Sequence, residues 1–516
     1  MNNAAYPDYF NDVFGPIMQP GSSSHTAGPC RLGYLANCLL KAPLGHIRIV
    51  LDPAGSFAST FGHMNEDVGM LAGAYGMLPD DERMFDIRKI LSDEGIGYDF
   101  QFEPLGTAPH PNTVRFILTD IYSREYVLQG VSTGGGRIRT ESVMGFEVEY
   151  CGTEYLYGSF DDYPDTGEAG IISKEVYTSK TGKKLYVVRT EEESGSDSLL
   201  ILRRVNPVVL KKNRKEQLFD GFASWIEITE NSGSTLFDTA LQYEINSSGW
   251  DANGILSYME FIRSIMERET GAVYEEAVTP LETPFSGYHY RKWDAYEKNG
   301  HMIIGDLESS VIKNVLGVQA LTRGVKLVPG PMGTGGGFMY SVIKSVAEKK
   351  GYDTGLIIKG LFIAAAVGAI AYTRMDPTGE AVGCAGECGV CSAMAAAAVT
   401  FMEGGTCYQV ESAASLSLQS AMGWACDPIP GGNNAPCFSR FMTAAVMSTV
   451  FADLALSKRD AVIPFDEVID EVKRMGQDMR DDLKCTSKGG ICRCPTAKKC
   501  KEEFAVWMKD EKSKGA

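Results

Sequence analysis

The pattern of hydrophobic residues changes near residue 248, and this change limits the folds that the 516-residue chain can adopt. Before it, short β-branched runs at 46–52, 113–121 and 127–138 alternate with helix-like segments at 66–78 and 82–95. After it, apolar residues recur at helical spacing to the end of the chain. The sequence therefore predicts an α+β N-terminal region followed by a mostly α-helical region.

The same pattern predicts three segments. We expect an α+β domain over residues 1–150, a strand-rich extension or insertion over 151–248, and a helical domain over 249–516 that ends in a Cys-rich tail. In the middle segment, residues 183–190, 198–205 and 224–230 have the composition of strands between polar turns. This segment is either a solvent-exposed embellishment or a regulatory or interface element.

Charge and hydropathy exclude several classes of partner. The formal net charge is −17, whereas phosphate binding needs clustered Lys and Arg. The first residues have no basic and apolar signal-peptide pattern. The most apolar stretch, 356–372, contains Lys359 and is shorter than a membrane span, so we expect a buried helix there. The sequence thus predicts a cytoplasmic protein with no nucleic-acid or membrane partner.

The cysteines are clustered rather than spread as in a disulfide scaffold. Of thirteen, six fall in 384–437 and four in 485–500, which favours metal ligation or redox chemistry. Cys384, Cys388 and Cys391 have the spacing of the radical-SAM motif, but too few residues follow them to build that barrel. Zinc binding by these three with a tail cysteine is an alternative.

Three polar loops in the first 120 residues offer binding groups. Residues 20–29 combine hydroxyls, backbone N–H groups and an imidazole, an arrangement suited to holding a carboxylate, in Ser22, Ser23, Ser24, His25 and Thr26. Helix capping by a serine is the simpler interpretation. Residues 55–68 repeat this composition and include His63, and residues 110–113 read His-Pro-Asn-Thr.

Taken in order, these motifs resemble those of the iron–sulfur-dependent L-serine dehydratases, which use no pyridoxal phosphate. The N-terminal matches are the loop at 20–29, Gly-Ser-Phe-Ala and Gly-His at 55–63, and 110–113. The C-terminal matches are Gly-Cys-x-Gly-Glu-x-Gly at 383–389, Cys-Asp-Pro at 426–428, Pro-Cys at 436–437 and Thr-Ser-x-Gly-Gly at 486–490. They cover nearly the whole chain.

The resemblance implies a cofactor and a reaction. Cys384, Cys426 and Cys437 correspond to the three ligands of a [4Fe–4S] cluster whose fourth iron is open and can act as a Lewis acid. β-Elimination would convert L-serine to pyruvate and ammonia. The serine-rich loop with His25, and His63, would grip the carboxylate or move the proton, with the base unassigned.

Further expectations come from the same resemblance. Family members can place a C-terminal cysteine on the open iron, and four tail cysteines are candidates here: Cys485, Cys492, Cys494 and Cys500. These cysteines are equally suited to a second metal. Family members are commonly homodimers, which we also expect here.

The sequence also departs from the family near the presumed pocket, at Met64–Asn65, 419–421 and 438–441. These changes leave the substrate open between serine, cysteine, threonine and other β-substituted acids. A non-catalytic iron–sulfur redox or sensor protein, and a zinc-stabilised structural protein, are the alternatives from other classes. Electron carriers normally close all four iron positions with protein cysteines, whereas this pattern supplies three.

Overall fold

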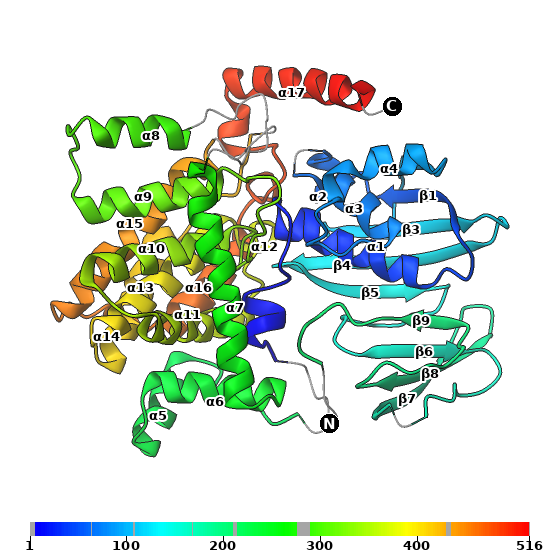
Figure 1. Cartoon of the computed structure of the whole chain (residues 1–516), viewed down its shortest axis with the longest axis horizontal. Coiled ribbons are helices and arrows are strands. Elements are labelled where there is room, and N and C mark those ends of the chain that lie inside the picture. The colour runs from blue at the N-terminus through cyan, green and yellow to red at the C-terminus, as the bar shows by residue number, and fades with distance from the viewer. Residues whose placement is uncertain are drawn as a thin grey trace. The chain divides into compact units, whose positions relative to one another are not determined.

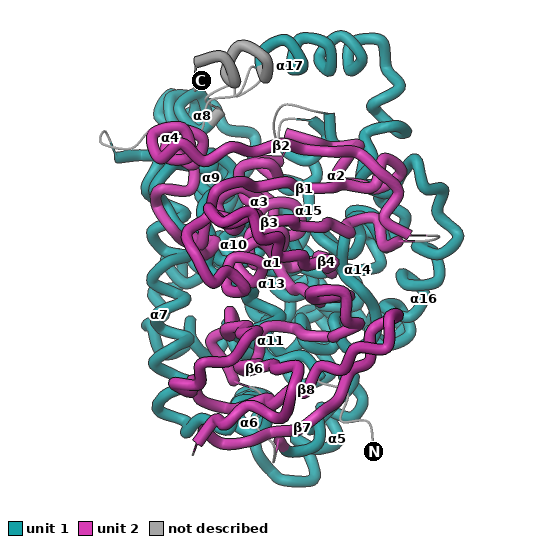
Figure 2. Tube along the Cα trace, turned by 90° about the vertical axis from the view of Figure 1, so that its right-hand side faces the viewer, with its two compact units in different colours: residues 1–20, 215–507 teal, residues 21–214, 508–516 magenta. Residues whose placement is uncertain are grey.

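The computed structural model describes residues 6–62, 64–106, 109–167, 169–209, 214–275, 289–429 and 435–514, with side chains to residue 507. Contacts divide the chain into two units, coloured separately in Figure 2. Residues 21–214 with 508–516 form one, here called the α+β unit. Residues 1–20 with 215–507 form the other, here called the helical unit. The predicted boundaries near 150 and 248 stay predictions.

The α+β unit is built on a five-stranded sheet with the order β2-β1-β3-β4-β5. β1 is parallel to β2, and the other neighbours are antiparallel. The strands are β1 (Leu44–Leu51), β2 (Gly97–Phe102), β3 (Thr113–Asp120), β4 (Glu125–Gly134) and β5 (Arg137–Val143). The short helices of this unit are η2 (Ser23–Ala27), α1 (Gly28–Cys38), α2 (Ser56–Ser59), α3 (Glu66–Tyr75), η3 (Met84–Asp86) and α4 (Ile87–Asp93).

Helices α1 and α3 pack together against this sheet (Figure 1). Their backbones approach closely because small residues face each other. A Cβ atom on Gly73 would lie 1.9 Å from the Cys30 carbonyl oxygen, and one on Gly33 would lie 2.6 Å from the Ala74 nitrogen. Glycine is therefore required at this crossing. The close contact fixes the start of α1, which follows the serine-rich loop.

A second, antiparallel sheet with the order β7-β8-β6-β9 shares the hydrophobic core of the first. Its strands are β6 (Tyr155–Ser159), β7 (Ile171–Thr178), β8 (Lys184–Thr190) and β9 (Leu200–Leu202). Leu156, Val187 and Leu202 belong to the same buried cluster as Ile138 and Val143 of the first sheet. The strands predicted at 183–190 and 198–205 are confirmed as β8 and β9.

The strand predicted at 224–230 is wrong, because these residues lie in helix α5 (Phe222–Ser232). Their β-branched residues suggested a strand, but glycines bracket the segment. Gly221 precedes the helix with extended backbone, and Gly233 ends it in the left-handed conformation that glycine favours. Trp225 and Thr229, one helical turn apart, are both buried. Tertiary burial on the helical period therefore outweighed the local preference.

The helical unit begins with η1 (Tyr9–Val13) and resumes at α5. Its longer helices are α6 (Leu236–Ser248), α7 (Ala252–Gly271), α8 (His289–Lys298), α9 (Asp306–Gln319), α10 (Gly335–Lys350), α11 (Thr354–Arg374), α13 (Val390–Met402), α14 (Cys407–Ala421), α15 (Cys437–Leu456), α16 (Phe465–Asp478) and α17 (Pro495–Lys514). Its short turns are η4 (Ala272–Tyr274), α12 (Gly379–Val382), η5 (Ala385–Gly389), η6 (Asp481–Leu483) and η7 (Gly490–Arg493). The predicted fold class, α+β followed by mostly helical, is confirmed.

Helices α11 and α13 form the centre of the helical unit. Residues 360–372 of α11 are all buried, which confirms the buried helix predicted at 356–372. By length and composition alone, three segments of the described chain would be apolar enough to cross a membrane: Thr354–Arg374, Ala385–Met402 and Cys437–Leu456. Inside the protein, their most apolar windows are 67%, 89% and 39% buried, respectively.

Candidate active site

The polar loops of the α+β unit meet at one end of the first sheet. Leu51 at the end of β1 is paired with Val114, and Thr113 at the start of β3 is paired with Val131 near the end of β4. Antiparallel pairing therefore brings the loop after β1, the turn before β3 and the end of β4 to one edge. The Ser56 N–H donates to the Pro111 carbonyl at 2.8 Å, which ties two of these loops together.

The imidazole of His25 is held between two hydroxyls. Its Nδ1 lies 2.8 Å from Ser24 Oγ, and its Nε2 lies 3.0 Å from Ser56 Oγ. The ring is buried and packs edge-to-face on Phe57, with ring centroids 5.3 Å apart. Two hydroxyls at hydrogen-bond distance fix the orientation of the ring and give each ring nitrogen a path for a proton.

The other residues of the serine-rich loop shape its backbone. Ser22 caps η2, where its hydroxyl accepts the His25 N–H at 3.2 Å, so the capping interpretation holds for this serine. The Thr26 hydroxyl donates to the Met64 carbonyl, which joins this loop to the one after β1. Ser23 is buried in η2. The predicted His63 lies outside the described residues.

Ser132 is a buried polar residue at this edge that the sequence interpretation did not name. It and Asn112 are neighbours across β4 and β3, joined by a 3.2 Å bond from the Ser132 N–H to the Asn112 carbonyl. Both side chains are buried, and within the described residues Ser132 Oγ and Asn112 Oδ1 have no hydrogen-bond partner. A Cβ atom on Gly28 would lie 2.2 Å from Ser132 Oγ, so Ser132 faces the start of α1.

Buried polar atoms without a hydrogen-bond partner are rare in proteins, and a bound ligand is one way to supply the partner. The available sequence signal was the position of Ser132 just before three glycines, at 134–136. The edge therefore combines an oriented imidazole, several hydroxyls and an amide, which together can bind the charged end of an amino acid.

Glu66, at the start of α3, is a second residue that the sequence interpretation missed. Its side chain is fully buried, and burial, together with the nearby Asp67, raises its pKa to about 8. One carboxyl oxygen accepts the Met64 N–H at 2.8 Å. Glu66 thus holds the same residue, Met64, that receives the Thr26 hydroxyl. With this raised pKa, the Glu66 carboxyl group is mostly protonated at neutral pH. It contacts the loop after β1, which the Thr26 hydroxyl joins to the serine-rich loop.

In the helical unit, the backbone before Cys384 takes a conformation that only glycine adopts readily. Gly383 has φ 68° and ψ −163°, and a Cβ atom there would lie 2.4 Å from the Trp424 carbonyl oxygen. The Cys384 N–H donates to that same oxygen at 2.8 Å. This contact anchors Cys384 beside the segment that carries Cys426.

The three predicted cluster cysteines interact electrostatically; Cys384 and Cys426 are buried, and Cys437 is partly exposed. Burial and the neighbouring thiols Cys426 and Cys384 raise the pKa of Cys437 well above its usual range. A hydrogen bond with Cys388, assisted by the Arg440 cation, lowers the pKa of Cys384 against the effect of its burial. The three cysteines come from separate segments. Cys384 immediately precedes η5, Cys426 lies between α14 and α15, and Cys437 begins α15.

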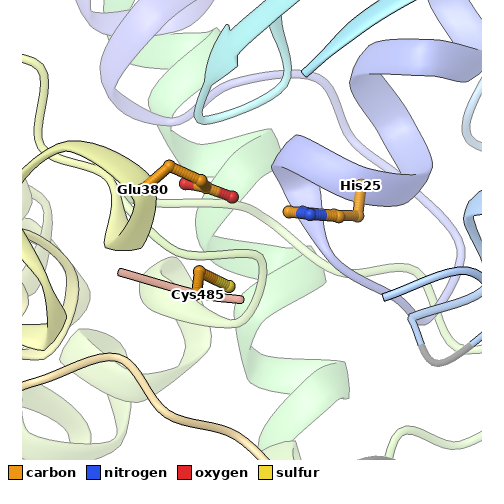
Figure 3. Close-up of side chains that lie close together, drawn as sticks. All are labelled: His25, Glu380 and Cys485. Atoms are coloured by element: carbon orange, nitrogen blue, oxygen red, sulfur yellow. The ribbon is translucent and has the colours of Figure 1, made fainter. Parts of the chain in front are cut away.

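The tail brings one of its four cysteines to this group. Interaction with Cys426 lowers the pKa of the Cys485 thiol, but burial together with the nearby charges of Glu380 and Glu387 raises it further, to about 12. The Cys485 thiol and a carboxylate oxygen of Glu380, on α12, lie within 4.8 Å of each other, and Figure 3 shows these two side chains. Cys492 donates instead to the carbonyls of Asp427 and Pro428. Cys494 is exposed and Cys500 lies on α17.

Asp427 connects the tail to the cluster cysteines. Its buried carboxylate accepts from Arg440 Nη1 at 2.7 Å and from the Ile491 N–H at 2.7 Å. A Cβ atom on Gly490 would lie 1.9 Å from the same carboxylate, so glycine at this position allows the approach. The Cys-Asp-Pro, Arg440 and Thr-Ser-x-Gly-Gly segments are therefore parts of one structure.

Comparison with known proteins identifies both parts of the chain. The family model described as "Serine dehydratase alpha chain" matches residues 323–492. The alpha chain of L-serine dehydratase from Peptoniphilus asaccharolyticus is 28% identical over 281 residues, which are 54% of this chain and 96% of that protein.

The beta chain of the same enzyme is 33% identical over 162 residues, 31% of this chain and 70% of that protein. The L-serine dehydratase TdcG of Escherichia coli is 35% identical over 136 residues, 26% of this chain and 30% of that protein. The chain therefore contains, in one polypeptide, counterparts of two chains that are separate in Peptoniphilus asaccharolyticus.

The raised pKa of Glu66 predicts a pH-dependent stability. The folded protein holds this proton up to about pH 8, whereas unfolded glutamate releases it near 4.5. The free energy of unfolding should therefore fall as pH rises between these values, by up to ~1.4 kcal/mol per pH unit. Glu66→Gln should flatten this slope in urea titrations, while Glu82→Gln, at an exposed position, should keep it. An unchanged slope in Glu66→Gln would show that Glu66 is ionised in the folded protein.

Proposed function

Since this chain belongs to the L-serine dehydratase family, with beta-like and alpha-like parts in one polypeptide, we propose that it is an iron–sulfur-dependent L-serine ammonia-lyase. As a lyase, it would remove water and then ammonia from L-serine and release pyruvate. The observation that carries the cofactor part of this proposal is the electrostatic interaction among Cys384, Cys426 and Cys437, of which the first two are buried and the third is partly exposed.

The donor set fits a cluster held by three cysteines. Cys384 is 3% and Cys426 is 6% exposed, and the charges of all three thiols interact. Arg440 supplies a cation close to Cys384, which would offset part of the negative charge of bound thiolates. When bound, a [4Fe–4S] cluster with three protein ligands supplies an iron with an open position, which polarises the leaving hydroxyl.

The chain's own residues would bind the amino-acid end of the substrate. The hydroxyls and N–H groups of the serine-rich loop are suited to the carboxylate, and Asn112 Oδ1 and Ser132 Oγ are suited to an ammonium group. His25, fixed by Ser24 and Ser56, would hold or pass a proton at its ring nitrogens. Neutralising the carboxylate makes the neighbouring Cα proton easier to remove, which elimination requires.

The proposal is tested by purifying the full chain without oxygen, measuring its visible spectrum, iron and sulfide, and assaying pyruvate from L-serine. Cys384→Ser, Cys426→Ser and Cys437→Ser should each lose most of the iron and activity, whereas Cys407→Ser on α14 should retain both. A brown protein that forms no pyruvate would reject L-serine as substrate and direct the assay to cysteine, threonine and other β-substituted acids. A colourless, zinc-containing protein, even after reconstitution, would overturn the proposal.

Ser132 should contribute to substrate binding rather than to the cluster. Ser132→Ala removes a hydroxyl that would bond a charged group, worth roughly 1.5–3 kcal/mol, so KM for L-serine should rise about tenfold or more. Iron content should not change. Thr133→Ala, next along the same strand but on its other face, is the matched control and should leave KM near the wild-type value. A wild-type KM in Ser132→Ala would remove Ser132 from the substrate site.

Among the tail cysteines, we propose Cys485 as the ligand that closes the open iron in the resting enzyme, since it is the one paired with Cys426. Cys485→Ser should then raise the initial rate of pyruvate formation and speed the loss of cluster absorbance in air, each several-fold. Cys492→Ser, whose thiol donates to backbone carbonyls, should change neither. Equal behaviour of the two variants would contradict the role of Cys485.

The predicted cytoplasmic location and homodimer belong to the same proposal. The relatives are named L-serine dehydratases, and free L-serine is a metabolite of the cytoplasm, which supports the cytoplasmic location. Sedimentation of the anaerobically purified chain would determine the oligomeric state.

A further inference from the structure

Two of the three proposed cluster cysteines each have a second thiol beside them. Cys384 Sγ lies 3.3 Å from Cys388 Sγ, one turn further along η5. Both side chains are buried, at 3% and 0% exposure. Cys388 is not among the proposed ligands, so this pair joins a ligand thiol to a non-ligand thiol.

The second pair is formed across two segments. The Cys426 N–H donates to the Leu483 carbonyl at 2.9 Å, and the Cys485 N–H donates to the Cys426 carbonyl at 2.7 Å. This backbone ladder places the two cysteines next to each other, and their thiols interact. Both residues are 6% exposed. The tail therefore brings Cys426 a neighbouring thiol.

The third position differs. Within the part of the chain that the structure describes, the Cys437 thiol makes no hydrogen bond to another thiol. It interacts with Cys426 and Cys384 only electrostatically. Cys391 lies nearby, against Gly335 at the start of α10, and within the described residues no hydrogen bond joins its thiol to either pair. The five thiols around the proposed cluster site thus divide into two neighbouring pairs and one single cysteine.

We propose that Cys388 and Cys485 are resolving thiols, which protect Cys384 and Cys426 when the cluster is absent. The inference relies on the proposed function only for naming Cys384 and Cys426 as ligands. Hydrogen peroxide would convert one thiol of a pair to a sulfenic acid, with release of water. The partner sulfur would then attack the sulfenic sulfur, form the disulfide and release a second water. Each pair loses two electrons, which reduce one peroxide.

The geometry favours this outcome over further oxidation. A sulfenic acid beside a second thiol condenses to a disulfide, whereas an isolated one can proceed to sulfinic and sulfonic acids, which are largely irreversible. A disulfide is reopened by a dithiol, so both ligand thiols would become available again for cluster assembly. Among the described residues no such partner lies beside Cys437, so irreversible oxidation should concentrate on this cysteine.

The experiment uses the full chain after anaerobic removal of iron with a chelator. The protein is treated with limited hydrogen peroxide and alkylated, and its peptides are mapped without reduction by mass spectrometry. We expect two links, Cys384–Cys388 and Cys426–Cys485, with sulfinic and sulfonic acids concentrated on Cys437. After treatment with a dithiol, Cys384 and Cys426 should react with the alkylating agent as in unoxidised protein.

Variants separate the two pairs. Cys388→Ala should raise irreversible oxidation of Cys384 at least several-fold and leave the Cys426–Cys485 link intact. Cys485→Ala should have the reciprocal effect on Cys426. Cys391→Ala and Cys492→Ala remove nearby thiols outside the pairs and should change neither link. Circular dichroism of each cluster-free variant checks that it is folded, and the wild-type map stands even where a variant does not fold.

Two results would overturn the inference. One is irreversible oxidation of Cys384 and Cys426 in the wild-type protein at the rate of Cys437. The other is a predominant link between Cys384 and Cys426. Because the protein in this experiment has no cluster and sees no serine, these outcomes are independent of the activity assay. A protein that forms both links but makes no pyruvate would refute the proposed reaction and retain the thiol pairs.

Discussion

The buried carboxylate of Asp427 is the interaction on which the cysteine group depends. A buried charge is costly unless it is paired and hydrogen-bonded, and this one is bonded by Arg440 from α15 and by the Ile491 N–H from the tail. The neighbouring residue Cys426 meets the tail through two backbone hydrogen bonds. One carboxylate therefore holds together the segments that carry Cys426, Cys437 and Cys485. Loss of Arg440 would leave this buried carboxylate without its cation.

The α+β unit uses a different constraint to assemble its polar loops. Strand pairing brings the end of β1, the start of β3 and the end of β4 to one edge, and the backbone contact between α1 and α3 fixes the serine-rich loop beside them. In both units, glycines permit the close approaches that side chains would prevent. The binding groups are thus positioned by backbone geometry, while the core supplies rigidity.

The sequence was sufficient for features that are encoded locally. Helical spacing predicted the buried helix at 356–372, and β-branched runs predicted β1, β3 and β8. It failed at 224–230, where burial on a helical period decided the outcome. It also missed β2, β5, β6 and β7, whose mixed composition gives a weak signal. Ser132, Glu66 and the partners of the cysteines were not predictable, since a residue's burial and neighbours depend on segments distant along the chain.

By itself, the sequence determined the order of an α+β and a helical part, the set of polar and cysteine-bearing motifs, and the family that these motifs resemble. Tertiary structure decided which of these residues have neighbours that change their chemistry. Of the four tail cysteines, it placed Cys485 beside Cys426. At the glycine-rich end of β4, it buried the Ser132 hydroxyl without a hydrogen-bond partner among the described residues. It also paired Cys384 with Cys388. The physical reason is that motifs are written in consecutive residues, whereas hydrogen bonds and burial join residues that only folding brings together.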